Sequence, residues 1–531
     1  MRRWNGWGDE ANDMPLPPHG QQFVAERIGA GQHLPDASLA QVLEQVPASR
    51  LAAHPLVVLD AEDRVRHARG QSLPDWLAVR EGRFGVFPDG VAYPQSAEDI
   101  RALLAYAQEH DVIVIPYGGG TSVAGHINPD ESAKPVLTVS LERMTQLTDL
   151  DTESQLATFG PGANGPQVEA QLRAKGYTLG HFPQSWELST LGGWVASRSS
   201  GQQSLRYGRI EQLFAGGTLE TFAGPLEIPT IPASSAGPDL REVVLGSEGR
   251  FGIISEVKVR VTPLAEQENF YAVFLPSWQQ ALGAIRALTQ AKVPLSMLRL
   301  SNAIETETQL ALAGHPTEIG LLEKYLKLRG AGVGKCMLMF GLTGNRTQNA
   351  ASYKQVKRLC KPYRGVFTGT ILGRKWAEKR FRLPYLRETL WQAGYVVDTL
   401  ETATDWCNVD SLLNKIETSL REALKDEGER VHVFTHLSHV YGQGSSIYTS
   451  YVYRPGGDYA TALARWKKLK YATSELIVRN RGTISHQHGV GADHAPYLPI
   501  EKGPLGIATL KALAKHFDPE QRLNPGKLLQ D

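Results

Sequence analysis

The chain has 531 residues, which is enough for two or three domains with full hydrophobic cores. Its 56 Lys and Arg residues balance 55 Asp and Glu residues, so no basic excess indicates nucleic-acid binding and no acidic tail indicates disorder. The three cysteines are widely spaced, which excludes an iron–sulfur cluster or a thiolate zinc site and suits a reducing compartment.

No targeting segment is evident in the sequence. The first residues are charged and then rich in Trp and Gly, without the apolar region of a signal peptide. No stretch reaches the ~20 apolar residues of a membrane span. The last residues are not a peroxisomal address of the Ser-Lys-Leu type. We therefore expect a cytoplasmic protein of bacterial type.

The order of predicted elements indicates an α+β protein with four parts. Residues 1–85 form an N-terminal extension with a helical stretch at 37–51, and residues 86–264 form a cofactor domain. In that domain we expect strands at 112–115, 135–141, 243–245 and 253–261, and helices at 97–108 and 167–175. Residues 265–480 read as a sheet-plus-helix cap. Its expected strands are 270–275, 297–300, 337–341, 431–437 and 447–453, and its expected helices are 278–290, 349–360 and 463–479. Residues 481–531 should return to the cofactor domain.

A glycine-rich loop follows the first of these strands. It reads Pro116-Tyr117-Gly118-Gly119-Gly120-Thr121-Ser122-Val123. Three glycines let the backbone approach a ligand and turn its N–H groups inward, and two hydroxyls add further donors. The loop lacks the Gly-x-Gly-x-x-Gly spacing of a Rossmann unit, which disfavours a nicotinamide cofactor. It predicts a cradle for a diphosphate.

Later segments repeat this mixture of glycines, hydroxyls and small residues. They are residues 184–193, 197–201 with Tyr207-Gly208, and 246–254. Together with the loop they predict contacts to a flat cofactor. The predicted cofactor-binding residues are Pro116, Tyr117, Gly118, Gly119, Gly120, Thr121, Ser122, Gln184, Ser185, Glu187, Ser189, Thr190, Gly193, Ser197, Ser200, Glu248, Gly249, Gly252 and Ile254.

Two histidines, His486 and His488, stand two residues apart in a glycine-flanked segment. If this segment is extended, both imidazoles share one face, where they suit proton transfer or anion binding. The alternative is a surface loop whose histidines bond to backbone.

Two tyrosines and two arginines are further candidates for the reacting centre. Tyr448 and Tyr451 should point to opposite faces of a strand, and either is a core residue or a catalytic one. Arg299 lies inside an apolar strand, so it should have an anionic or polar partner. Arg387 is either an exposed helix charge or a ligand-binding group.

The spacing of His432, His436 and His439 invites a metal interpretation, because metal-dependent flavin dehydrogenases for D-2-hydroxy acids have a similar pair. Here the Gly-Asp-Gly-Asn turn of those enzymes is absent. A neutral amide, Gln487, precedes His488-Gly489, and it is a poor ligand for a hard divalent cation. We expect no metal.

In this order the glycine-rich segments resemble the two-subdomain FAD-binding domain of the vanillyl-alcohol oxidase / p-cresol methylhydroxylase superfamily. Nearly end to end, the chain resembles its alkyldihydroxyacetonephosphate synthase (alkylglycerone-phosphate synthase) family. The matching segments outside the cofactor domain are Trp4-Asn5-Gly6-Trp7-Gly8 and residues 298–302, 385–387, 446–448 and 485–491.

This resemblance implies non-covalent FAD and exchange of the acyl group of acyl-dihydroxyacetone phosphate for a long-chain alcohol, without net electron transfer. It implies that Tyr448, with a lowered pKa, is the acid–base group, that Arg387 binds phosphate, and that Arg299 is required. His486 and His488 match the outer two of three histidines, with Gln487 in the middle place. A homodimer is expected, and a peripheral membrane contact stays open.

Other functions keep the same fold. The main alternative is an FAD-dependent D-2-hydroxy acid dehydrogenase, with His488 or Tyr448 as base and Arg299 or Arg387 holding the carboxylate. A flavin-binding scaffold without activity and a peroxide-forming oxidase are the other two. All four use a small-molecule ligand and no nucleic acid.

Overall fold

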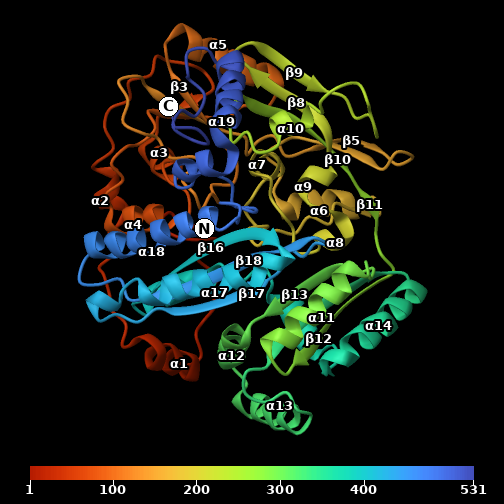
Figure 1. Ribbon diagram of the computed structural model, residues 1–531. Helices are drawn as coiled ribbons and strands as arrows, with labels where there is room; N and C mark the ends of the chain where they lie inside the picture. The colour runs from red at the N-terminus through yellow and green to blue at the C-terminus, as the bar shows by residue number, and fades with distance from the viewer. Residues whose placement is uncertain (531) are drawn as a thin grey trace.

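The computed structural model describes residues 1–530. Two main sheets lie in its first half (Figure 1), besides the two-stranded pair of β7 (Tyr177–Thr178) and β11 (Thr262–Pro263), as expected for an α+β cofactor domain. One has the order β1 (Val57–Val58), β2 (Gly90–Ala92), β4 (Val136–Ser140) and β3 (Ile113–Tyr117), and β2, β4 and β3 are parallel. The other is antiparallel, in the order β5 (Leu147–Asp151), β6 (Leu156–Phe159), β10 (Ile253–Arg260), β8 (Phe214–Thr221) and β9 (Gly224–Ile228).

Strand β3 positions the glycine-rich loop. Its residues Ile113 and Ile115 are buried, and the loop begins where the strand ends. Helix α5 (Ala97–Glu109) precedes β3; Ser96 caps it by accepting the N–H of Asp99. The apolar side of α5 packs in the core of the parallel sheet. The glycine-rich loop therefore starts at the end of a strand that this core holds in place.

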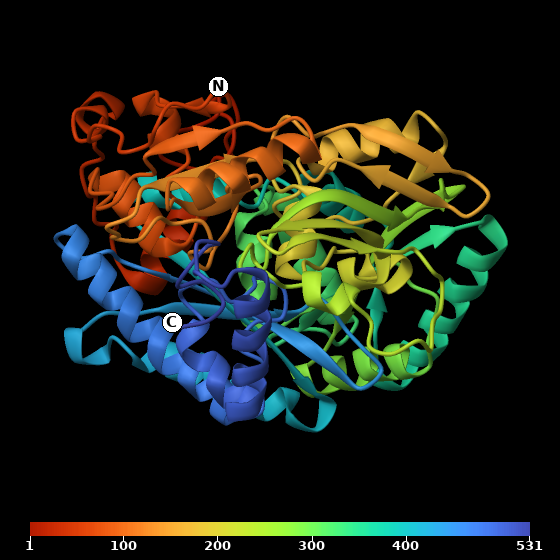
Figure 2. The same cartoon turned by 90° about the horizontal axis from the view of Figure 1, so that it is seen from above.

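A seven-stranded antiparallel sheet forms the second half. Its order is β15 (Val366–Phe367), β12 (Gln267–Leu275), β14 (Cys336–Gly344), β13 (Met297–Ser301), β17 (His432–Leu437), β18 (Gly444–Tyr453) and β16 (Val396–Asp405). Side chains such as Val433, Leu437 and Tyr451 face a core shared with helices α11 (Trp278–Gln290), α14 (Arg346–Cys360), α17 (Trp406–Glu422) and α18 (Tyr459–Arg479). Alternate residues face the other side. Figure 2 shows the two halves from above.

The remaining elements are mostly short helices. They are α1 (Pro18–Ile28), α2 (Leu39–Leu43), α3 (Ala61–Arg66), α4 (Leu73–Glu81), α6 (Gly165–Arg173), β7 (Tyr177–Thr178), α7 (Leu191–Ser197), α8 (Ser204–Tyr207), α9 (Ile210–Leu213), α10 (Arg241–Val244), β11 (Thr262–Pro263), α12 (Ala303–Leu312), α13 (Pro316–Leu328), α15 (Ile371–Lys379), α16 (Tyr385–Gln392) and α19 (Leu498–Phe517), with 3-10 turns at Lys361–Tyr363, Lys425–Glu427 and Ala495–Tyr497.

The end of the chain contacts the first half. The side-chain amide of Asn524 donates to the carbonyls of His126 (2.9 Å) and Glu248 (2.8 Å), and Leu523 bridges to Val114 of β3. We keep the four ranges 1–85, 86–264, 265–480 and 481–531 as a proposed division, because β11 ends at 263 and α18 at 479.

Two predicted elements are wrong. Only Leu39–Leu43 of residues 37–51 is helical, because the capped turn at Ser38 is soon followed by Pro47, which cannot donate within a helix. Residues 243–245 form the end of helix α10 instead of a strand. The carboxylate of Asp239 accepts the N–H of Arg241 (2.9 Å), which stabilises a helical turn over a segment too short to pair.

Within residues 1–530, no helix is long and apolar enough to cross a membrane.

We predict that acid destabilises this fold from about pH 6.5 downward. Burial lowers the pKa of eight histidines; it falls to about 4 for His67 and His432 and to about 3 for His181 and His494, and the others are His436, His439, His486 and His488. The unfolded chain therefore binds these protons first, and each of the four histidines with the most strongly lowered pKa, His67, His432, His181 and His494, removes about 1.4 kcal/mol of stability per pH unit below pH 6.5.

Chemical denaturation between pH 8 and pH 5 measures this slope. His67→Phe should reduce it by about one proton, whereas the exposed control His516→Gln should not change it. Stability independent of pH below 6.5 would contradict the prediction.

Candidate active site

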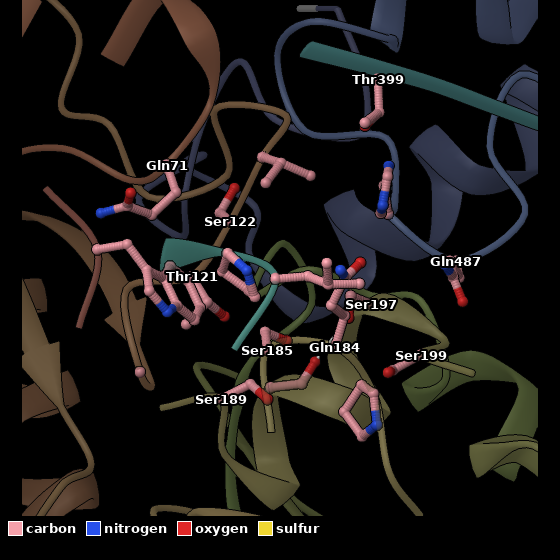
Figure 3. A pocket seen from close by; sticks show the side chains of 18 of the residues that line it. Gln71, Thr121, Ser122, Gln184, Ser185, Ser189, Ser197, Ser199, Thr399 and Gln487 are labelled. Carbon is pink, nitrogen blue, oxygen red and sulfur yellow. Dashed lines mark hydrogen bonds between the residues drawn. The ribbon is translucent and has the colours of Figure 1, made fainter. Parts of the chain in front are cut away.

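A cavity of about 490 Å³ lies between the two halves, within the range of ligand pockets. Its walls come from the glycine-rich loop, residues 183–200 and 247–254, the cap sheet, α12 and α16. Figure 3 shows side chains from these separate segments, among them Ser122, Gln184 and Gln487, around the same space.

The loop is pressed against the segment at 188–190, and this contact requires its glycines. A Cβ on Gly119 would lie 1.9 Å from the carbonyl oxygen of Leu188, and one on Gly118 would lie 2.4 Å from Thr190 Oγ1. Gly120 has φ +69°, and its Cβ would meet the hydroxyl of Tyr117. The result is a cavity wall made of bare backbone, which fits a diphosphate.

Of the residues predicted to bind the cofactor, all but Glu187 line this cavity. Glu187 instead accepts a hydrogen bond from the Tyr385 hydroxyl on α16 (2.9 Å), which directs its carboxylate away. A carboxylate near a diphosphate would be repelled, so this position is consistent with an anionic cofactor.

The histidine segment is a loop rather than an extended strand, so the condition under which both imidazoles would share one face is not met. The buried carboxylate of Glu401 accepts the N–H groups of Gln487 (2.7 Å) and His488 (2.6 Å) and lies between the two imidazoles. His488 lines the cavity. His486 does not; its Nε2 lies against Tyr441 Oη (2.6 Å) and Arg209 Nη1 (2.5 Å).

Although burial opposes it, the neighbouring His488 and His486 hold the pKa of Glu401 well below its usual range. The loop therefore closes around a charged carboxylate, and this carboxylate sets the positions of both imidazoles.

Tyr448 lies at the centre of the cavity wall. It stands between Glu401 and His436 in a cross-strand row, stacks on the His436 ring (4.8 Å) and meets the His488 ring edge-on (5.7 Å). Its hydroxyl donates to Thr399 Oγ1 (3.3 Å). Tyr451 points to the opposite face, into the core. Burial raises the pKa of Tyr448 to about 12, so the expected lowered pKa is wrong for this state and the phenol is neutral.

Arg299 has the anionic partner that its apolar strand predicts. Its Nη2 donates to Glu305 Oε1 (2.6 Å), and the same oxygen meets His436 Nδ1 (3.0 Å). Although burial opposes it, these two neighbours lower the pKa of Glu305 to about 2. The pair fixes the His436 ring against Tyr448.

Arg387 is not an exposed helix charge. It lines the cavity, lies over the Trp76 ring (4.4 Å) and donates from Nη1 to the carbonyl of Gln71 (2.6 Å). Its buried Nε and Nη2 have no partner among residues 1–530. An unpaired guanidinium in a cavity wall suits an anionic ligand group.

The three histidines of the metal interpretation have separate partners. His432 bonds to Thr308, His436 to Glu305, and His439 to Ser200. Among residues 1–530, no group of three His, Cys, Asp or Glu side chains could hold a metal ion.

Sequence reasoning missed Glu401, Glu305, Thr399 and His126, which all contribute to the site. Glu401 lies in β16, an edge strand of the cap sheet, where the sequence gives no sign that its carboxylate is buried. Glu305, Thr399 and His126 look like ordinary helix, strand and loop residues. His126 contacts Ser122 Oγ (2.5 Å) and Glu248 (3.2 Å). Burial disfavours the charged ring, but the Glu248 carboxylate raises the pKa of His126.

Family models divide the chain along this cavity. Residues 88–224 match the FAD binding domain, and residues 264–528 match the C-terminal domain of FAD linked oxidases. A solved p-cresol methylhydroxylase has the same fold, with a TM-score of 0.67 and 13% identity over 94% of this chain and 99% of that one. The chain is therefore an FAD-dependent flavoprotein of the FAD linked oxidase class.

Relatives with higher sequence identity indicate which kind of FAD-dependent enzyme this is. An alkyldihydroxyacetonephosphate synthase of Trypanosoma brucei brucei is 29% identical, over 99% of this chain and 92% of that protein. A solved alkyldihydroxyacetonephosphate synthase aligns with a TM-score of 0.84 and 26% identity over 98% of both chains. The protein is an FAD-dependent enzyme of the alkyldihydroxyacetonephosphate synthase type.

We predict that Gly119→Ala weakens FAD binding by at least about tenfold. The new Cβ would lie 1.9 Å from a backbone oxygen, so the loop must move away from residues 188–190. Titration of apoprotein with FAD measures this. The control Gly320→Ala, which meets nothing within 4 Å, should leave FAD affinity unchanged. Equal affinities for both variants would overturn this view of the loop.

We predict that Glu401→Gln lowers the free energy of unfolding by about 2 kcal/mol. The amide keeps the shape but replaces charge-assisted hydrogen bonds to two backbone N–H groups by weaker ones. Denaturant titration of the FAD-loaded protein measures the loss. The exposed control Glu307→Gln should stay within about 0.5 kcal/mol. If Glu401→Gln were as stable as wild type, Glu401 would not hold the loop.

Proposed function

We propose that this enzyme exchanges the acyl group of acyl-dihydroxyacetone phosphate for a long-chain alcohol. The observation that carries the proposal is the composition of this cavity, whose walls include bare backbone, a row of polar side chains and an apolar arm. These three parts suit a flavin, a reacting centre and an aliphatic chain.

The apolar arm extends from the Tyr448 row along one face of the cap sheet. Its walls are Val24 of α1, Leu312 of α12, Leu386 and Leu390 of α16, and Val397, Phe434 and Val452 of the sheet. The arm runs from the His436–Tyr448 pair past Phe434–Ser450 to the His432–Val452 pair, which is four residue steps along β17, or about 13 Å. Burial lowers the pKa of His432 to about 4, so this part of the arm is uncharged.

Arg387, on α16 beside Leu386 and Leu390, suits the phosphate of the substrate. Its guanidinium is delocalised and always charged, and two of its nitrogens lack partners among residues 1–530. We infer that it holds the phosphate, while the arm holds the chain. The carbon to be exchanged would then lie at the Tyr448 row, between these two anchors.

FAD, held without a covalent bond, would supply the electron-rich and electron-accepting centre. The protein's own groups move protons there. Neutral Tyr448 and His488, 5.7 Å apart between ring centres, can pass a proton between substrate and imidazole. Glu401 orients His488 from behind, and Arg299 places positive charge beside the same row.

The alternative of a D-2-hydroxy acid dehydrogenase has less support. Such a substrate is small and polar and needs no apolar arm lined by seven hydrophobic side chains.

The test is to supply acyl-dihydroxyacetone phosphate and a fatty alcohol to the FAD-loaded enzyme. We expect free fatty acid and ether product in equal amounts. Tyr448→Phe should lower kcat by about 10² to 10⁴, and Arg387→Ala should raise KM at least about tenfold without loss of FAD. The exposed neighbour Arg382 provides a control, since Arg382→Ala should change neither value.

Anaerobic bleaching of the flavin by 2-hydroxy acids, with no fatty acid released from the acyl substrate, would contradict the proposal and favour the dehydrogenase. Loss of FAD in Arg387→Ala would contradict the role of Arg387 alone.

We also retain three predictions about the protein's surroundings: a homodimer, a cytoplasmic location and a peripheral contact with lipid. The last is supported by Leu321 and Leu328 of α13 and by Val333, which are exposed beside Lys324 and Lys327.

A further inference from the structure

A second, smaller chamber of about 50 Å³ adjoins the reacting centre. It shares Arg299, His436, Tyr448 and Gln487 with the main cavity, together with Gln184 and Ser200. Its other walls, which the main cavity does not touch, are Gln202, Met297, Trp376, Ser438 and His439. Such a volume exceeds what one water needs, and most of its lining can form hydrogen bonds.

The chamber continues the line of the apolar arm. Along β17 and just beyond it, His432 and Phe434 line only the main cavity, His436 lines both, and Ser438 lines only the chamber. A linear molecule lying along this strand would have its tail beside Phe434 and its head beside Ser438. The two ends differ in polarity, as the two ends of an amphiphile do.

Arg299 has hydrogen-bond donors without partners at this chamber. Both of its hydrogen-bonding contacts, to Glu305 and His436, use Nη2. Its Nε and Nη1 have no hydrogen-bond partner among residues 1–530. Both atoms keep some accessible surface. Because Arg299 lines both spaces, these donors are available to a ligand there.

Two side-chain amides add to this set. The buried oxygens of Gln202 and Gln487 have no hydrogen-bond partner among the described residues. Either amide can therefore turn its N–H groups toward a ligand. The chamber has one cationic group in its wall and no carboxylate among its lining residues.

We propose that this chamber binds the carboxylate of a fatty acid, with the chain extending back along the apolar arm. A guanidinium edge with two neighbouring amides matches a carboxylate better than a neutral hydroxyl. The inference rests on the proposed function for its ligand: the carboxylate is that of the acyl group released in the exchange.

Binding is measured without turnover, on the FAD-loaded enzyme, from the change in flavin absorbance on adding octanoate or 1-octanol. Gln202→Glu places a like charge in a wall that only the chamber has, so it should raise the octanoate Kd by at least about tenfold. The neutral control Gln202→Leu should raise it no more than about threefold. The 1-octanol Kd should be equal in both variants.

Ser438→Met is a second test of carboxylate binding, because the longer side chain fills the chamber without adding charge. It should weaken octanoate and spare 1-octanol. An octanoate Kd that neither Gln202→Glu nor Ser438→Met changes, equal weakening of both ligands, or no octanoate binding at all would overturn the inference and make the chamber a water site. Exchange activity is scored separately, so its absence would contradict the proposed function while carboxylate binding that depends on Gln202 still supported the chamber.

Discussion

Two buried carboxylates hold the loop at residues 485–491, and the rest of the site depends on them. Glu401 of the cap sheet accepts the N–H groups of Gln487 and His488, and Glu248 of the first half accepts those of Val490 (2.5 Å) and Gly491 (2.7 Å). One short segment is thus bonded to both halves of the molecule. Because these charges are buried, losing their partners would be costly, and the two halves stay in register around the cavity.

This arrangement explains why one cavity has walls of such different character. The first half contributes bare backbone, in which glycines allow the loop to approach Leu188 and Thr190. The cap contributes one face of an antiparallel sheet, whose cross-strand rows run from Tyr448 and His436 to Val452 and His432. A cofactor held by the first half and a long substrate held by the cap can therefore meet in the cavity between the two halves.

Much of the fold and cofactor site could be predicted from sequence, because glycine-rich turns and β-branched strands are local signals. The alternation that separates Tyr448 from Tyr451 is also local, and it is confirmed. Glu401, Glu305 and Thr399 could not be ranked, since nothing local distinguishes a polar side chain that turns inward. The expectation of a lowered pKa for Tyr448 does not hold in this state for a similar reason. Segments distant in sequence bury the phenol and raise its pKa, and the residues next to it in sequence do not indicate that burial.

A density map of the purified enzyme with FAD and a long-chain substrate analogue tests the account most directly. We expect the FAD diphosphate against the amides of Gly118, Gly119 and Gly120, the flavin ring beside Tyr448, and the chain of the analogue along Phe434 and Val452. A diphosphate bound elsewhere, or a chain outside the arm with side chains filling it, would contradict the central claim that one cavity joins cofactor, reacting centre and lipid.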